Sequence, residues 1–203
     1  MSTKVAVVFG TLIALFMVAA PFGYKRWHDK QYRNFRVVEE GVLYRSGQLP
    51  LPRLQQFVMM HGIRTVVCLR KGNDPLDQQE ESWVKGRSLK FVRIQPLSWD
   101  PDENGKVPSE AALQTFRDVM DDSANYPVLV HCFAGIHRTG AMCAVFRMDY
   151  QGWTNDQAMS EMRMMGYSIL DDHEDVLAYM VKYRPPHAGR KVAAVPASLQ
   201  IDP

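Results

Sequence analysis

The sequence is poor in cysteine, and none of its cysteines is spaced for cross-linking or metal binding. Only Cys68, Cys132 and Cys143 occur among its 203 residues. An odd number of cysteines without a CxxC pair argues against a disulfide framework and against a structural zinc site. It suits a reducing compartment, where free thiols persist. The sequence shows no cluster of metal-ligating residues, so we expect neither a metal nor another cofactor.

The sequence also lacks an excess of basic residues in its central part. The whole chain has a net charge of +2, but residues 34–185 carry 17 Lys and Arg against 20 Asp and Glu. Nucleic-acid-binding domains are usually basic, so nucleic acid is not expected among the partners. The hydrophobic content of 46% and the charged content of 23% are those of a globular chain with a core.

Long apolar runs are absent except at the amino terminus. Residues 5–24 carry no charge, and a helix of that length spans about 30 Å, which is the thickness of the hydrocarbon core of a bilayer. A cleaved signal peptide is the alternative, but Pro21 directly follows the candidate cleavage site at residues 18–20. We therefore favour an uncleaved membrane anchor over residues 1–24, followed by a linker over residues 25–34.

Positive charge is concentrated on one side of this apolar run. The basic residues that follow it are Lys25, Arg26, Lys30 and Arg33. Because the more positive flank stays inside, this asymmetry predicts a single-pass membrane protein whose catalytic domain is cytoplasmic. The membrane is then one partner of the chain.

Beyond residue 34 the apolar pattern alternates between strands and helices. Short apolar runs predict a hairpin at 37–48 and strands at 63–70, 89–97 and 127–132. Amphipathic segments and their end signals predict helices at 51–62, 74–86, 109–122, 138–152, 154–166 and 171–183. We expect an α/β layered domain and a disordered tail over residues 186–203.

Residues 131–140, HCFAGIHRTG, join the last predicted strand to a helix. A strand, a tight loop and a helix amino terminus bring several backbone N–H groups around one point and form an anion site. Helix ends and cations lower the pKa of a thiol. We therefore expect Cys132 to act as a thiolate nucleophile, and Arg138 to bind phosphate oxygens through its planar fork of donors.

This segment also carries a family resemblance. With five residues between Cys132 and Arg138, it matches the pattern H-C-x-x-G-x-x-R-[ST]-G and resembles the protein tyrosine phosphatase superfamily. The segments NFRVVEEGVLYRSGQL (34–49) and GIRTVVCLR (62–70) are similar to the atypical dual-specificity phosphatases of plants and fungi and their bacterial relatives. The resemblance implies a phosphatase domain over residues 35–185, with a central twisted mixed sheet of four to five strands flanked by helices. A buried structural cysteine and rhodanese-type sulfur transfer are the alternatives, and neither accounts for the full motif.

The resemblance also implies a role for each of several residues. Phosphate ester hydrolysis would pass through a phosphocysteine at Cys132, with His131 orienting the loop and lowering the thiol pKa, and Thr139 offering its hydroxyl to the departing sulfur. The general acid would be an aspartate about thirty residues before the cysteine. Asp100 is our first choice and Asp102 the alternative, since the order W-D-P-D departs from the W-P-D of classical tyrosine phosphatases.

The loop residues expected to contact substrate are Phe133, Ala134, Gly135, Ile136, His137 and Arg138. Phe133 and Ile136 either form an apolar rim or pack beneath the loop. An apolar rim favours phosphotyrosine on proteins, with phosphoserine and phosphothreonine as further substrates, because a highly charged substrate would prefer lysines there. A phosphoinositide or inositol (pyro)phosphate substrate is the alternative, and a non-catalytic phosphate-binding module is the second alternative.

Overall fold

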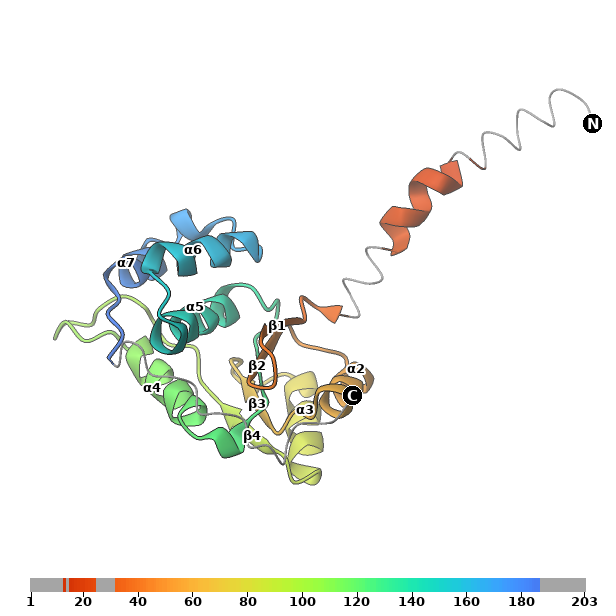
Figure 1. Cartoon of the computed structure of the whole chain (residues 1–203), viewed down its shortest axis with the longest axis horizontal. Coiled ribbons are helices and arrows are strands. Elements are labelled where there is room, and N and C mark those ends of the chain that lie inside the picture. The colour runs from red at the N-terminus through yellow and green to blue at the C-terminus, as the bar shows by residue number, and fades with distance from the viewer. Residues whose placement is uncertain (1–12, 14, 25–31, 187–203) are drawn as a thin grey trace, which may run out of the picture.

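The computed structural model describes residues 13, 15–24 and 32–186 (Figure 1). Residues 15–24 are helical. No helix within the described ranges is long and apolar enough to cross a membrane. The prediction of a single-pass membrane protein with a cytoplasmic catalytic domain is therefore wrong, and the membrane is not supported as a partner.

The other predicted boundaries of the chain stay predictions. Residues 1–12 and 14 of the predicted anchor, 25–31 of the predicted linker and 187–203 of the predicted tail lie outside the described residues. The last part of the predicted linker contacts the domain, since the Tyr32 ring lies 5.7 Å from the ring of Phe57, measured between centroids.

A five-stranded mixed sheet forms the centre of the fold, in the order β1-β2-β5-β3-β4. The strands are β1 (Arg36–Glu39), β2 (Leu43–Ser46), β3 (Thr65–Cys68), β4 (Lys90–Arg93) and β5 (Val128–His131). Only β1 is antiparallel to its neighbour. The register places Ser46, Cys68 and His131 side by side, so the carboxyl ends of three parallel strands meet at one edge, where ligands of such sheets bind.

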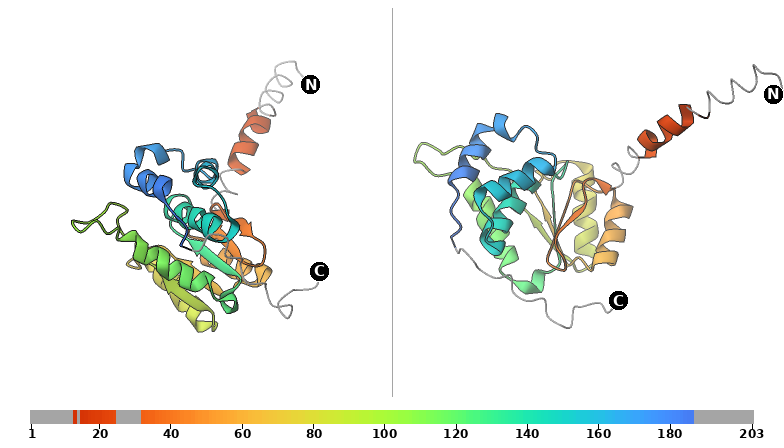
Figure 2. Two further views of the ribbon diagram at one scale, coloured as in Figure 1. Left: turned by 60° about the vertical axis from the view of Figure 1, so that its left-hand side comes forward. Right: turned by 45° about the horizontal axis from the view of Figure 1, so that its top comes forward.

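Helices cover both faces of this sheet (Figure 2). One face packs against α2 (Leu51–His61) and α3 (Pro75–Gly86). The other face is covered by α4 (Ser109–Met120), α5 (His137–Gln151), α6 (Asn155–Met164) and α7 (Glu174–Lys182). Because side chains alternate along a strand, Leu129 of β5 joins the first core, while Val128 and Val130 join the second.

The structure confirms the predicted α/β fold with a mixed sheet and most of its elements. The predicted capping box of α6 is present, since Thr154 Oγ1 accepts a hydrogen bond from Gln157 N and Gln157 Oε1 accepts one from Thr154 N. The predicted helix 171–183 is instead divided into a 3-10 turn, Leu170–Asp172, and α7.

Two glycines let the end of β2 lie directly against the loop that follows β5. A Cβ on Gly47 would lie 2.7 Å from the carbonyl oxygen of Phe133, and one on Gly135 would lie 2.4 Å from Gly47 N. Gly135 also has a φ of 72°, in the left-handed region that favours glycine. The two backbone segments can therefore approach only because neither residue carries a side chain.

We predict that Gly47→Ala lowers the free energy of unfolding by about 1–3 kcal/mol, the usual cost of forcing an extra group into a packed site. The contacting atoms are backbone atoms and cannot turn aside as a flexible side chain could. Urea unfolding of the full-length chain measures this change.

Gly86→Ala is the matched control. A Cβ on Gly86 would meet no atom within 4 Å, and alanine is favoured over glycine in a helix by up to about 1 kcal/mol. We therefore expect Gly86→Ala to be neutral or stabilising. Equal unfolding midpoints for the two variants would contradict the close approach described for Gly47.

Candidate active site

The candidate site lies where β5 passes into α5. His131 ends β5, residues 132–136 form a short loop that we call the cysteine loop, and His137 begins α5. Among the described residues, no side chain caps the amino terminus of α5, so its positive dipole end can face an anion. The cysteine loop also adjoins the carboxyl edge of the parallel strands.

Three successive carbonyls of the cysteine loop are each bound by a donor from residues 34–48. The bonds run from Gln48 N to Phe133 O (3.0 Å), from Asn34 Nδ2 to Ala134 O (2.9 Å) and from Arg45 Nη2 to Gly135 O (2.9 Å). Because these carbonyls are held toward the body of the protein, the intervening amides turn toward the other side of the loop. The loop thereby becomes a concave set of N–H donors, which is an anion-binding arrangement.

The thiol of Cys132 lies at the base of this set of amides. Its residue is 3% exposed, and Gly135 N donates to its Sγ at 3.3 Å. Burial raises the pKa of the Cys132 thiol, but the Thr139 hydroxyl, the amides of Thr139 and Gly135, and the charge of Arg138 lower it, and the net direction is downward. The sequence predicted that Thr139 and Arg138 act together with Cys132, and the structure places both residues near the Cys132 sulfur.

Arg138 lines a cavity of about 460 Å³ beside the cysteine loop. Its Nη1 donates to the Leu69 carbonyl at 2.6 Å, which fixes the guanidinium at the end of β3. The other residues that line this cavity are Arg70, Lys71, Asn73, Asp77, Pro96, Leu97 and Phe133. The cavity therefore combines positive charge with an apolar wall.

The two apolar residues of the cysteine loop differ in position. Phe133 is 52% exposed and stands at the rim, with the Arg70 guanidinium 5.3 Å from its ring centroid. Ile136 is half-buried and packs against the core, where it lies next to Gly166. Of the two arrangements left open by the sequence, Phe133 adopts the rim position and Ile136 the packed position.

The two histidines of the motif also occupy different surroundings. His131 is 2% exposed, and its Nδ1 lies 3.4 Å from the carbonyl oxygen of Cys132. His137 is exposed, and its ring lies 4.4 Å from the ring of Tyr167. Partial burial and the neighbouring charges of His173 and Arg138 lower the pKa of His137, so it adds little positive charge at neutral pH.

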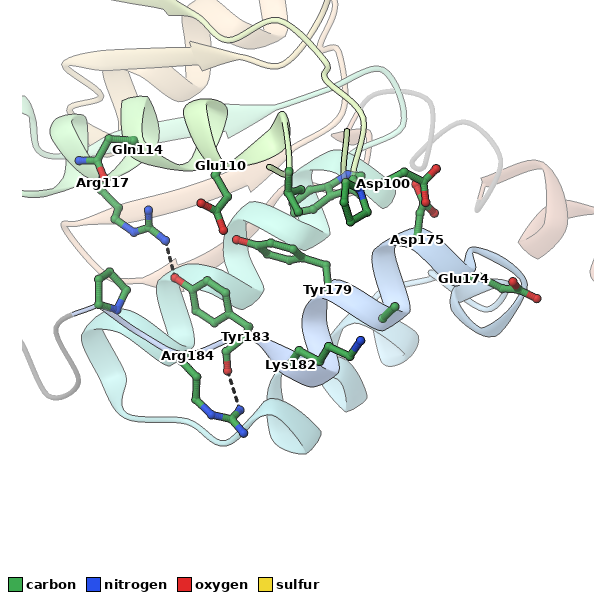
Figure 3. A pocket seen from close by; sticks show the side chains of 15 residues that line it. Asp100, Glu110, Gln114, Arg117, Glu174, Asp175, Tyr179, Lys182, Tyr183 and Arg184 are labelled. Atoms are coloured by element: carbon green, nitrogen blue, oxygen red, sulfur yellow. Dashed lines mark hydrogen bonds between the residues drawn. The ribbon is translucent and has the colours of Figure 1, made fainter. Parts of the chain in front are cut away.

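Asp100 is not brought to the cavity that holds Arg138. It is exposed and lines a separate cavity of about 790 Å³ between α4 and α7, with Glu110, Asp175 and Tyr179 (Figure 3). The preceding residue, Trp99, contacts the Tyr179 ring at a centroid distance of 5.0 Å. Trp99 also lines a small cavity of about 20 Å³ together with Arg138. The loop that carries Asp100 therefore adjoins Arg138 through Trp99, although Asp100 itself does not.

Asp102 is held within its own loop. Its Oδ1 accepts hydrogen bonds from the backbone amides of Asn104 and Lys106, both at 2.9 Å. Backbone hydrogen bonds of this kind stabilise a turn. The carboxyl of Asp102 is therefore occupied locally, whereas the structure shows no such bond to the carboxyl of Asp100 within the described part of the chain.

Sequence reasoning missed several residues that support the site. Glu80 of α3 receives a 2.6 Å contact from His131 Nε2, and Arg45 and Asn34 hold the loop carbonyls. The sequence holds only a weak signal for Glu80: Asp77, Glu80 and Val84 share one helical face, which the structure shows to be buried. Acidic residues on the buried face of a helix need partners from another element.

Cys68, Glu80 and His131 are the group of possible metal ligands that the described residues bring within 4.8 Å of one another. His131 Nε2 and Glu80 Oε1 are 2.6 Å apart, which is a direct hydrogen-bond distance. Two ligands of one tetrahedral zinc ion lie about 3.3 Å apart, given bonds of about 2 Å. The group therefore fits a hydrogen-bonded pair better than a metal centre.

Comparison with known proteins connects this geometry to a family. A family model described as a DSP-PTPase phosphatase fused to NAD+ kinase matches residues 14–176. The dual specificity protein phosphatase TpbA of Pseudomonas aeruginosa is 29% identical over 141 residues, which are 68% of this chain and 58% of TpbA. The inositol diphosphatase DSP3 of Arabidopsis thaliana is 27% identical over 128 residues, which are 63% of this chain and 60% of DSP3. The chain thus spans less than two thirds of the length of these curated relatives.

Solved structures show the same fold. The crystal structure of P. aeruginosa TpbA superposes with a TM-score of 0.58 at 26% identity and covers 74% of this chain and 85% of that one. The core catalytic domain of the PP-IP phosphatase SIW14 from S. cerevisiae gives a TM-score of 0.59 at 22% identity, with the same coverage. The family model covers most of the chain, and the resemblance predicted from the HCFAGIHRTG motif is confirmed. The chain therefore belongs to the DSP-PTPase phosphatases.

Proposed function

We propose that this protein hydrolyses phosphate monoesters through a phosphocysteine intermediate, with phosphotyrosine on proteins as the first substrate class and phosphoserine and phosphothreonine as further ones. The observation that carries the proposal is the orientation of the cysteine loop. Its carbonyls are bound on the far side, and its Gly135 amide points at the Cys132 sulfur. Such a cradle favours both a thiolate and a bound phosphate.

The proposed reaction has two steps. The Cys132 thiolate attacks phosphorus, so the S–P bond forms and the P–O bond to the leaving group breaks. The leaving oxygen takes a proton from Asp100. Water then attacks the phosphocysteine, gives its proton to Asp100, and releases inorganic phosphate and the thiolate. Arg138 and the loop amides hold the phosphoryl oxygens in both steps, and the Thr139 hydroxyl donates to the departing sulfur.

Two observations support Asp100 over Asp102 as the general acid. The Asp102 carboxylate already accepts two backbone hydrogen bonds within its turn, whereas Asp100 is exposed and directly follows Trp99, which adjoins Arg138. The proposed step requires this loop to carry Asp100 from the α4–α7 cavity to the anion site. Active-site loops of this kind commonly close on binding substrate.

The residues that line the cavity beside Arg138 support an aryl phosphate as the substrate. Phe133 is exposed at the rim, and Pro96 and Leu97 add apolar surface beside Arg138. Arg70 adds little net positive charge to the cavity, because its guanidinium is paired with Asp74 at 3.2 Å and with Asp77 at 2.7 Å. A TpbA structure in complex with pTyr, 26% identical to this chain, is consistent with the same preference.

One observation favours an inositol (pyro)phosphate as the second candidate substrate. Lys71 and Arg138 line the cavity together with the paired Arg70, and a highly charged substrate needs several cations. DSP3 is named an inositol diphosphatase, and SIW14 is described as a PP-IP phosphatase. A phosphoinositide would use the same cations.

The first test measures phosphate release by the full-length protein, with Cys132→Ser as the blank. The substrates are a phosphotyrosine peptide, an inositol pyrophosphate and phosphoinositide vesicles. We expect release from the peptide to be fastest and to vanish in the variant. Faster release from either inositol compound would make that compound, and not a phosphoprotein, the substrate. Phosphate binding without any release would show that the chain is a non-catalytic binding module.

Substitution of the two aspartates tests the choice of general acid. We expect Asp100→Asn to lower kcat by about a hundred-fold or more, the usual contribution of general acid catalysis, and Asp102→Asn to remain close to wild type. The loss should be larger for phenyl phosphate than for 4-nitrophenyl phosphate, because the more basic phenoxide needs the proton more. Steady-state kinetics on both esters measure it, and the opposite ranking of the variants would assign the role to Asp102.

Alkylation by iodoacetamide tests the thiol. The pKa of Cys132 is lowered, whereas burial raises the pKa of Cys143, so of these two thiols Cys132 stays a thiolate to lower pH. We expect the rate of Cys132 alkylation, followed by peptide mass spectrometry, to have its midpoint below the ordinary value of about 8.5. Cys143 should stay unmodified, and inorganic phosphate should protect Cys132. A midpoint at or above the ordinary value would refute the proposed cradle.

A further inference from the structure

A buried acid–histidine pair lies directly beneath the cysteine loop. Glu80 Oε1 and His131 Nε2 are 2.6 Å apart, and the two residues are 4% and 2% exposed. Glu80 belongs to α3, whereas His131 ends β5 next to the nucleophile. Because burying a carboxylate is costly unless it is paired and hydrogen-bonded, this contact must be made whenever the protein is folded.

The second oxygen of Glu80 is also bound. Gln48 Nε2 donates to Glu80 Oε2, and Gln48 Oε1 accepts from Arg70 Nη1 at 3.0 Å. The backbone N–H of Gln48 in turn donates to the Phe133 carbonyl of the cysteine loop. Glu80 is thus linked to the loop by two routes, one through His131 and one through Gln48.

The opposite nitrogen of the His131 ring faces the loop itself. Its Nδ1 lies 3.4 Å from the carbonyl oxygen of Cys132, so a proton on Nδ1 points at the peptide that joins Cys132 to Phe133. A carboxylate on one ring nitrogen commonly selects the tautomer and orientation of a histidine and so determines what the other nitrogen does. A neutral ring protonated only on Nε2 would instead set a lone pair against that carbonyl.

We propose that Glu80 is a positioning residue that fixes the His131 ring, and through it the carbonyl of Cys132, in the orientation in which the cysteine loop receives the substrate phosphate. Glu80 touches neither substrate nor the reacting atoms. Its catalytic effect rests on the proposed phosphatase function, but its effect on His131 does not.

The charges around His131 support this role. Glu80 on α3 and Cys68 on β3 face the His131 ring. Arg93 on β4 contacts Cys68, with its Nη1 3.4 Å from the Cys68 sulfur, and Cys132 directly follows His131 in the chain. Burial lowers the pKa of His131, but the charge of Glu80 and hydrogen bonds with Cys68 and Glu80 raise it well above its ordinary value. An imidazolium carries a proton on both nitrogens, so Nδ1 remains a donor, and its charge favours a thiolate nearby.

The experiment compares wild type with Glu80→Gln, which keeps the size of the side chain, removes its charge, and replaces one of its two acceptor oxygens by an amide donor. NMR of histidine-labelled full-length protein reports the protonation of His131, assigned with His131→Asn. We expect the wild-type ring to stay doubly protonated well above the ordinary histidine value of about 6.5, because Glu80 raises the pKa of His131, and the Glu80→Gln ring to lose a proton at a lower pH than the wild-type ring. Identical titrations would overturn the proposal, whether or not the protein proves to be a phosphatase.

Activity gives a second readout. In Glu80→Gln, kcat/KM for the phosphotyrosine peptide should fall with rising pH through the same ionisation, by about ten-fold for each pH unit above its midpoint, and the wild type should lack this limb over the same pH range. Glu81→Gln is the matched control, because Glu81 is the adjacent acid of α3 and pairs with Arg93 and Lys85 away from His131. A lower melting temperature for Glu80→Gln with an unchanged pH profile would make Glu80 purely structural and overturn the proposal.

A double-mutant cycle keeps the test decisive if Glu80→Gln folds poorly. Asparagine at position 131 can donate to the Cys132 carbonyl without a partner acid, so His131→Asn removes the need for Glu80. We expect His131→Asn and its combination with Glu80→Gln to have the same kcat/KM and pH profile, which is full coupling. A further loss in the double variant would show that Glu80 acts independently of His131 and would contradict the proposal. Absence of turnover in wild type as well would refute the phosphatase function alone, because the NMR titration still decides the role of Glu80.

Discussion

The binding of three successive loop carbonyls by donors from residues 34–48 is the constraint on which the rest of this site depends. A short loop can present its amides to an anion only if its carbonyls find partners elsewhere, because buried backbone groups are costly when unpaired. The parallel register of β2 and β5 supplies those partners, since Ser46 lies opposite His131 and the chain then runs along the loop. The backbone contact between Gly47 and Gly135 brings the donors close enough. The YRSGQ segment therefore belongs to the site as much as the cysteine motif does.

A layer of buried charge supports this arrangement from beneath. Arg70 binds Asp74, Asp77 and Gln48, and Gln48 and His131 bind Glu80. A network of this kind is favourable only when every member is paired, and removing one partner leaves another charge buried. The position of the cysteine loop is thus determined both by backbone hydrogen bonds from β2 and by charged side chains from α3. The same layer places Arg70 beside Phe133 at the rim of the cavity.

Most of the elements and the central residues of the site could be predicted from the sequence, because they rest on local patterns. Apolar periodicity predicted the strands and helices, and the spacing of Cys132 and Arg138 predicted their meeting. The residues that were missed, such as Glu80 and Arg45, act across elements far apart in the chain, and a local pattern does not reveal a partner 51 or 90 residues away. The predicted membrane anchor rested on hydropathy alone, and no helix within the described ranges is long and apolar enough to cross a membrane. The sequence left both Asp100 and Asp102 open as the general acid, because it does not show the turn in which the Asp102 carboxylate accepts two backbone hydrogen bonds.

The cysteine loop is proposed to be an oxyanion cradle with Cys132 at its base, and a crystal structure of the protein with orthovanadate tests this most directly. Vanadate takes the geometry of a phosphoryl group in transfer. We expect vanadium to be bonded to Cys132 Sγ and its equatorial oxygens to be bound by the amides of the loop and by the guanidinium of Arg138, while the carbonyls of residues 133–135 stay bound to Gln48, Asn34 and Arg45. Vanadate bound away from Cys132, or a loop carbonyl turned toward the anion, would contradict it.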